Sequence, residues 1–145
     1  MTVYTIGFAK KSAEQFFEAL RQASVERVCD VRLRPSSQLS GFAKQKDLAY
    51  FLEKLCNVEY LHIPALAPTS EMLDGYKKKR GSWAHYEASF LELMRQRKVE
   101  RLISAELLEN SCLLCSEHSP EFCHRRLVVD YLNSTWTTRL AVIHL

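Results

Sequence analysis

Glycine and proline are scarce in this sequence, with four residues of each among 145. Such a composition excludes a collagen-like chain and a chain made mainly of flexible linkers. No apolar run approaches the ~20 residues that a helix needs to cross a bilayer, so no membrane association is predicted. The first nine residues lack a basic stretch ahead of an apolar one, and a secretory signal peptide is therefore not expected.

The rest of the composition is typical of a globular protein. Hydrophobic residues make up 47% and charged residues 26% of the chain. The length predicts one domain, residues 1–145, with a single core. The net charge of +3 is compatible with a small anionic partner and does not require nucleic acid. Five cysteines without a signal peptide indicate reduced thiols in a cytoplasmic protein.

Strand-like and helix-like segments alternate along the chain. Ser12 and Gln15 form a capping box that predicts a helix start, and Ser119-Pro120-Glu121 has the residues of another. Helices between the strands imply right-handed crossovers, so we predict an α/β fold with a mainly parallel five-stranded sheet flanked by helices, a Rossmann-like three-layer arrangement. Strands are expected at 3–6, 27–32, 58–63, 112–115 and 139–143, further helices at 47–56, from 83 and around 99–107, and long loops at 35–45 and 65–82.

Several chemically capable residues come directly after the predicted strands. Gly7 follows the first, Asp30 and Arg32 end the second, and Cys115 and Glu117 end the fourth. In open parallel sheets, ligands bind outside the carboxyl ends of the strands. This edge of the sheet is therefore the candidate site.

The segment from 115 to 126 is the most informative, because it leaves a strand and enters a helix. Cys123 lies near the expected helix start beside Arg125, an arrangement that lowers the pKa of a thiol and also favours anion binding. His124 lies on the apolar face of the helix. The alternative is that Cys123 and His124 only fill the space between helix and sheet.

Neither a redox pair of Cys112 and Cys115 nor a functional role for Cys29 and Cys56 is favoured. Cys112 and Cys115 have the spacing of a redox pair, but residues three apart on a strand point to opposite faces. Cys29 and Cys56 lie in apolar or amphipathic surroundings and are interpreted as small core residues.

Four segments resemble the Domain of Unknown Function 488 family. They are Tyr-Thr-Ile-Gly at 4–7, Asp-Val-Arg with the following Pro and Ser at 30–36, Leu-Cys-Ser-Glu at 114–117, and Cys-His-Arg at 123–125. The resemblance implies an intracellular bacterial or archaeal protein with an α/β fold and a site at these residues, and it names no reaction. Family members usually have Ile-Gly-His near the start, where this chain has Phe8.

Two charged groups have alternative interpretations. Asp30 and Arg32 share a face of their strand, so Arg32 either binds a phosphate or carboxylate or forms an ion pair that closes the sheet edge. The basic run 77–80 is expected to be a solvated loop, and it becomes a lid over an anionic ligand if it folds across the strand ends.

Three hypotheses for the function remain open, and whether the protein is an enzyme is among the questions. The first is an enzyme with a reactive thiolate that acts on a phosphate- or carboxylate-bearing substrate. The second is a zinc or iron site, the one cofactor type that the residues suggest. The third is a non-catalytic module that binds a nucleotide or nucleic acid. In the first, Cys123 is the nucleophile and Cys115 a second thiol, Arg32, Arg125 and Gly7 bind the anion, and His124, Glu117 or Asp30 move protons. In the second, the ligands are Cys115, Cys123 and His124, with Glu117 or a bound molecule as the fourth donor.

The first hypothesis makes a geometric prediction. The seven residues between Cys115 and Cys123 form one strand-to-helix connection, which should bring the two sulfurs close together. With His124 and the Asp30–Arg32 edge of the second strand, they should line one concave pocket at the carboxyl edge of the sheet.

Overall fold

Five strands form one sheet in the order β3-β2-β4-β1-β5, and every neighbouring pair is parallel. The computed structural model describes residues 1–37 and 41–145, so positions 38–40 of the predicted loop lie outside the described residues. The strands are β1 (Thr2–Gly7), β2 (Arg27–Asp30), β3 (Glu59–His62), β4 (Ser111–Cys115) and β5 (Ala141–His144). All five overlap the predicted strands.

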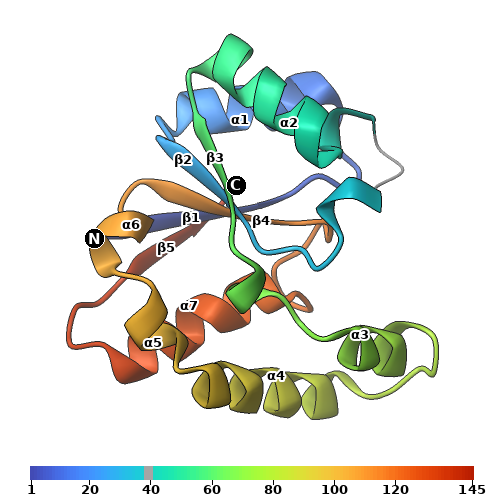
Figure 1. The fold of residues 1–145 in the computed structure, drawn as a ribbon. Coiled ribbons are helices and arrows are strands. Elements are labelled where there is room, and N and C mark those ends of the chain that lie inside the picture. The colour runs from blue at the N-terminus through green and yellow to red at the C-terminus, as the bar shows by residue number, and fades with distance from the viewer. Residues whose placement is uncertain (38–40) are drawn as a thin grey trace.

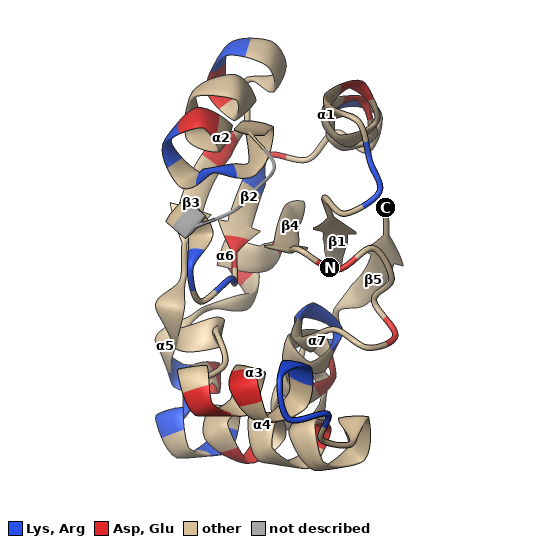
Figure 2. Cartoon of the chain, turned by 90° about the vertical axis from the view of Figure 1, so that its right-hand side faces the viewer, with Lys and Arg blue, Asp and Glu red and all other residues tan. Residues whose placement is uncertain are grey.

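Helices cover both faces of the sheet (Figure 1). On one face lie α1 (Ala13–Gln22) and α2 (Gln45–Phe51). On the other lies α7 (His124–Thr135), with α4 (Trp83–Arg97) packed against it. Figure 2, turned by 90°, shows the sheet between these two groups. The predicted three-layer α/β fold is therefore confirmed.

The start of α1 follows from its capping residues. The Gln15 amide donates to Ser12 Oγ at 3.1 Å, and the Ser12 amide donates to Gln15 Oε1 at 2.9 Å. The helix buries Phe16, Phe17 and Leu20 against the sheet. The predicted helix at 47–56 is α2 together with a π-helical turn at Leu52–Cys56.

The core has two parts, one on each side of the sheet. Along β4, the side chains of Cys112 and Leu114 belong to the part under α1 and α2, whereas Leu113 and Cys115 belong to the part under α7 and α4. Cys112 and Cys115 therefore point to opposite faces, as the strand periodicity predicts. Cys115 faces the first residues of α7.

Two predictions about the segment 65–107 need correction. The stretch 65–82 is not wholly irregular, because α3 (Ser70–Lys77) begins there with Thr69 Oγ1 accepting from the Met72 amide at 3.2 Å. The helix expected from residue 83 is α4, which ends before Lys98, whose φ of 53° is left-handed. The helix expected around 99–107 is not a single helix. Two short helices follow, α5 (Val99–Leu102) and α6 (Ala105–Leu108).

The predicted helix start at Ser119-Pro120 is also wrong, since α7 begins at His124. The residues before it form a turn, in which the Cys123 amide donates to the Pro120 carbonyl at 3.3 Å. Cys123 is thus the N-cap residue of α7. Its backbone is extended, with φ −138° and ψ 139°. Its sulfur lies near that of Cys115, the last residue of β4.

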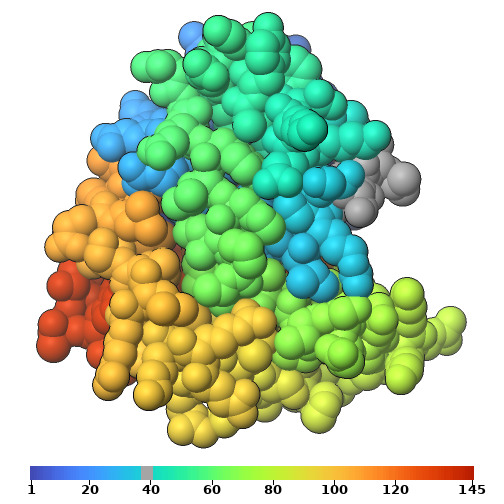
Figure 3. All heavy atoms as spheres, in the orientation of Figure 1, coloured from blue at the N-terminus to red at the C-terminus, as the bar shows by residue number. Residues whose placement is uncertain are grey.

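The edge strand β3 forms part of the molecular surface. Figure 3 shows β3 and the segment after it, in green, between the orange helices α5 and α6 and the cyan residues that follow β2. Among the described residues, no helix is both long and apolar enough to cross a membrane.

Candidate functional site

Cys115, Cys123 and His124 form one cluster at the carboxyl end of β4. Cys115 is the last residue of that strand, Cys123 caps α7 and His124 opens it. The two sulfurs and a ring nitrogen of His124 all lie within 4.8 Å of one another. The side chains are almost enclosed, with relative exposures of 5%, 2% and 5%. The prediction that the two sulfurs are near neighbours is confirmed.

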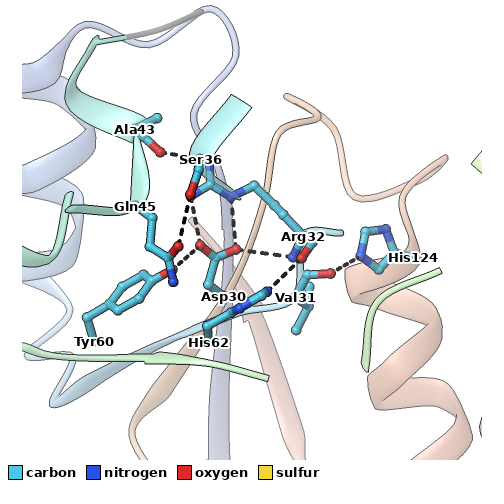
Figure 4. Close-up of polar contacts among 9 residues, drawn as sticks. All are labelled: Asp30, Val31, Arg32, Ser36, Ala43, Gln45, Tyr60, His62 and His124. Atoms are coloured by element: carbon cyan, nitrogen blue, oxygen red, sulfur yellow. Dashed lines mark hydrogen bonds and ion pairs between the residues drawn. The ribbon is translucent and has the colours of Figure 1, made fainter. Parts of the chain in front are cut away.

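Two hydrogen bonds orient the imidazole of His124. Its Nε2 lies 2.7 Å from the Val31 carbonyl oxygen, which can only accept, so Nε2 carries a proton. Nδ1 lies 3.6 Å from Cys115 Sγ. In the neutral ring, Nδ1 therefore holds the lone pair and can take the proton of the Cys115 thiol. Figure 4 shows the ring directed at Val31, the residue that follows β2.

The electrostatics place the thiolate on Cys115. The pKa of Cys115 is lowered because the Cys123 thiol donates a hydrogen bond to it and because His124 adjoins it. Burial acts to lower the pKa of His124, but the Cys115 thiolate outweighs burial and raises it. Burial and the neighbouring Cys115 raise the pKa of Cys123. The expectation of a lowered pKa at Cys123 is therefore not met, because Cys123 is buried and lies beside the Cys115 thiolate.

Arg125 is fully buried beside this cluster. Its Nη1 donates to the Glu117 carbonyl at 2.6 Å, and its Nη2 donates to the His118 carbonyl at 3.2 Å. Nη1 also lies 3.6 Å from Cys123 Sγ. Within residues 1–37 and 41–145, no carboxylate forms an ion pair with this guanidinium. Arg125 thus holds the connection between β4 and α7 in place.

Gly7 permits this arrangement through its lack of a side chain. A Cβ atom at Gly7 would lie 1.5 Å from the Glu117 carbonyl oxygen and 2.8 Å from Arg125 Nη1. The glycine lies beside Cys115 in the sheet register. The structure therefore places Gly7 and Arg125 against the protein's own main chain, where the sequence analysis expected a bound anion.

Asp30 and Arg32 form a buried bidentate ion pair, drawn in Figure 4. Arg32 Nε lies 2.9 Å from Asp30 Oδ1, and Nη2 lies 2.7 Å from Oδ2. Tyr60 Oη donates to the same Oδ2 at 2.6 Å, and Arg32 Nη1 donates to the Ala43 carbonyl at 2.8 Å. Burial and then Asp30 raise the pKa of Tyr60. This geometry favours the ion-pair interpretation over the anion-binding one.

Two cavities meet the cluster. The larger, about 270 Å³, is lined by Cys115 and His124 together with Arg32, Leu33, Arg34, Pro68, Leu73 and Ser116. The smaller, about 30 Å³, is lined by all three residues of the cluster and by aromatic side chains that include Trp83, Tyr86 and Phe122. Cys115 and His124 border both spaces, so a small molecule in the larger cavity would meet the thiol and the imidazole together.

Glu117 lies on the side of the smaller cavity. Its carboxylate forms an ion pair with Lys77, the last residue of α3. The first residue of the basic run 77–80 thereby reaches the connection after β4. Both side chains remain substantially exposed, so this contact contributes little to stability.

Some residues of the site were missed by sequence reasoning. The Val31 carbonyl has no sequence signal, because any residue supplies the same atom. Phe90 packs on the His124 ring at a centroid distance of 5.4 Å, and its helical spacing with Tyr86 indicated only burial. Arg34, at the larger cavity, donates to Ser70 Oγ at 2.6 Å.

The fold and the cluster together define a class: an α/β protein with a parallel sheet and a Cys-Cys-His group at its carboxyl edge. A family model described as Domain of unknown function DUF488 matches residues 12–132. The chain belongs to this family. No curated protein and no solved structure gives a significant match.

Proposed function

We propose that this protein is a thiol-dependent enzyme in which Cys115 is the nucleophile and His124 its proton partner. The observation that carries the proposal is the relay from Cys115 Sγ to His124 Nδ1, at 3.6 Å, and from His124 Nε2 to the Val31 carbonyl, at 2.7 Å. A nucleophile beside a base that a third group orients is the arrangement that covalent catalysis needs. From the sequence, Cys123 was the expected nucleophile, but His124 contacts Cys115, which favours Cys115 for this role.

The first chemical step follows from this pair. The Cys115 thiolate attacks an electrophilic atom of the substrate and forms a covalent bond to sulfur. The bond from that atom to the leaving group breaks, and the imidazolium of His124 gives its proton to the leaving group. His124 is then neutral, with the Nδ1 lone pair free to activate the molecule that completes the reaction.

The larger cavity supports a small substrate with an anionic group. A volume of about 270 Å³ lies just below the usual range for ligand sites. Leu33, Pro68 and Leu73 give it apolar walls, and Arg34 is a cation on its border. A phosphate or carboxylate near Arg34 would leave the rest of a short molecule beside Cys115.

Site-resolved alkylation tests this assignment. The native protein is treated with iodoacetamide near neutral pH, and the modified cysteines are located by peptide mass spectrometry. Cys115 should react faster than Cys29, Cys112 and the half-exposed Cys56, because burial raises the pKa of each of those thiols. Preferential modification of Cys56, with Cys115 protected, would contradict the proposal.

A metal centre is the second candidate function, and one distance favours it. Tetrahedral zinc with Zn–S near 2.3 Å and Zn–N near 2.0 Å puts sulfur and nitrogen about 3.6 Å apart. The distance between Cys115 Sγ and His124 Nδ1 is 3.6 Å. The hydrogen bond from His124 to Val31 also resembles the outer contact of a metal-bound histidine. Cys115, Cys123 and His124 would be the protein ligands, and the cavity would supply the fourth position.

Metal analysis separates the two candidates. The thiol enzyme is expected to purify with well under one zinc or iron per chain and to keep its alkylation rate after chelator treatment. A metal centre would give one metal per chain, and Co²⁺ substituted into it would show thiolate charge-transfer absorption. The variant Cys112→Ser should leave both results unchanged, since that thiol lies on the other face of the sheet.

A further inference from the structure

The site contains a second thiol that the first chemical step does not use. We propose that Cys123 resolves the covalent bond formed at Cys115, so that the enzyme reacts with small carboxylate-bearing disulfides and ends with a Cys115–Cys123 disulfide. This inference rests on the proposed function, because it takes Cys115 as the nucleophile.

The geometry selects Cys123 as the resolving thiol. Its sulfur lies within 4.8 Å of Cys115 Sγ and of a His124 ring nitrogen. Cys112 is nearer in sequence, yet its side chain lies on the opposite face of the sheet. The end of β4 and the cap of α7 thus bring together two thiols that are separated by seven residues in the chain.

The two cavities separate the positions that disulfide exchange needs. Exchange requires the attacking sulfur, the central sulfur and the leaving sulfur to lie nearly in line. A disulfide in the larger cavity meets Cys115, whereas Cys123 lines only the smaller cavity. In the second step, the half of the substrate bound to Cys115 would occupy the larger cavity, whereas the attacking Cys123 lines the smaller one.

The atoms and protons balance over two steps. The Cys115 thiolate attacks one substrate sulfur, the substrate S–S bond breaks, and the imidazolium of His124 protonates the departing thiolate. Neutral His124 then takes the proton of Cys123, and the Cys123 sulfur attacks Cys115. The bond between Cys115 and the substrate breaks, and the second departing thiolate receives that proton. The substrate disulfide is reduced to two thiols, and the two cysteines are oxidised to one disulfide.

The preference for a carboxylate comes from Arg34. It borders the larger cavity, which Cys115 also lines, so a small disulfide held there could contact both residues. Arg34 donates to Ser70 Oγ at 2.6 Å, and its positive charge attracts a carboxylate in the cavity that it borders. An uncharged disulfide of similar size lacks this contact and should react more slowly.

The experiment treats the reduced protein with 3,3′-dithiodipropionate and follows intact and peptide masses. The wild type should release two thiols per chain and gain a Cys115–Cys123 disulfide. The variant Cys123→Ser should release one thiol and retain a stable mixed disulfide on Cys115. The variant Cys115→Ser should give neither product, and Cys56→Ser should behave as the wild type.

The charge preference has its own control. Arg34→Ala should slow the reaction with dithiodipropionate at least about tenfold, which corresponds to about 1.4 kcal/mol, and should leave the rate with bis(2-hydroxyethyl) disulfide unchanged. Equal slowing with both reagents would contradict the carboxylate preference.

The outcomes also distinguish this inference from the function on which it rests. A stable mixed disulfide on Cys115 of the wild type, with no internal disulfide, would overturn the resolving role and leave Cys115 as the nucleophile. If Cys115 reacts with neither disulfide and does not react with iodoacetamide, both proposals are overturned.

Discussion

The Nε2 atom of His124 donates a hydrogen bond to the main-chain carbonyl of Val31 at 2.7 Å. This contact joins the first residue of α7 to the residue that follows β2, across the carboxyl edge of the sheet. It orients the imidazole toward Cys115. Because the acceptor is a main-chain oxygen, no second titratable side chain takes part in this contact. The position of the Val31 carbonyl depends in turn on its neighbours Asp30 and Arg32, whose ion pair holds the backbone on both sides of it.

Arg32→Ala is expected to destabilise the protein strongly. The change leaves the carboxylate of Asp30 buried without its cation, and the loss of one partner of a buried pair costs about 3–5 kcal/mol. Urea denaturation measures the free energy of unfolding. The double variant with Asp30→Leu and Arg32→Met should recover much of the loss, because no buried charge then remains. A loss below about 1 kcal/mol for Arg32→Ala would show that solvent reaches this pair.

Gly7→Ala should lower the free energy of unfolding by about 1–3 kcal/mol or more, the range for overpacked sites. The new methyl group would overlap the Glu117 carbonyl, and the atom it displaces is main chain. Gly75→Ala in α3 is the matched control, since a Cβ there meets nothing within 4 Å. The control should be neutral or up to ~1 kcal/mol more stable, as expected for alanine in a helix. Equal stability of the two variants would contradict the close approach at Gly7.

Arg125→Met tests whether the buried guanidinium holds the connection between β4 and α7. The variant leaves the Glu117 and His118 carbonyls without their donor, so the free energy of unfolding should fall by about 2 kcal/mol or more. The alkylation rate of Cys115 should change as well, because the connection joins it to Cys123. Unchanged stability and unchanged alkylation would show that the connection keeps its shape without Arg125.

Much of the fold could be predicted from local patterns. Short β-branched runs separated by helical periodicity indicate a parallel sheet, and the Ser12–Gln15 capping box marks the start of α1. The start of α7 could not be predicted in the same way. Ser119 and Pro120 are suitable helix-start residues, but Arg125 draws the carbonyls at 117 and 118 into a turn, and that contact is tertiary.

The candidate site was predicted in composition but not in its assignment of roles. Strand ends and the Cys-His-Arg segment indicate which residues converge. Whether His124 contacts Cys115 or Cys123 depends on the rotation of α7 and on the Val31 carbonyl, and neither is visible in residue types. Arg32 and Arg125 were expected to bind an anion. Burial instead directs their donors to Asp30 and to main-chain oxygens, which removes two cations from the surface available to nucleic acid.

The pH dependence of Cys115 alkylation tests the central claim, the thiolate on Cys115 beside a protonated His124. A thiol with a lowered pKa keeps its reactive thiolate as the pH falls and loses it only below that pKa. The wild type should therefore react at half its maximal rate well below the pH of about 8.5 that is typical of a free cysteine. Both Cys123→Ala, which removes the donated hydrogen bond, and His124→Gln, which removes the cation, should move this midpoint to higher pH. A wild-type midpoint near 8.5 or above, unchanged in both variants, would contradict the account.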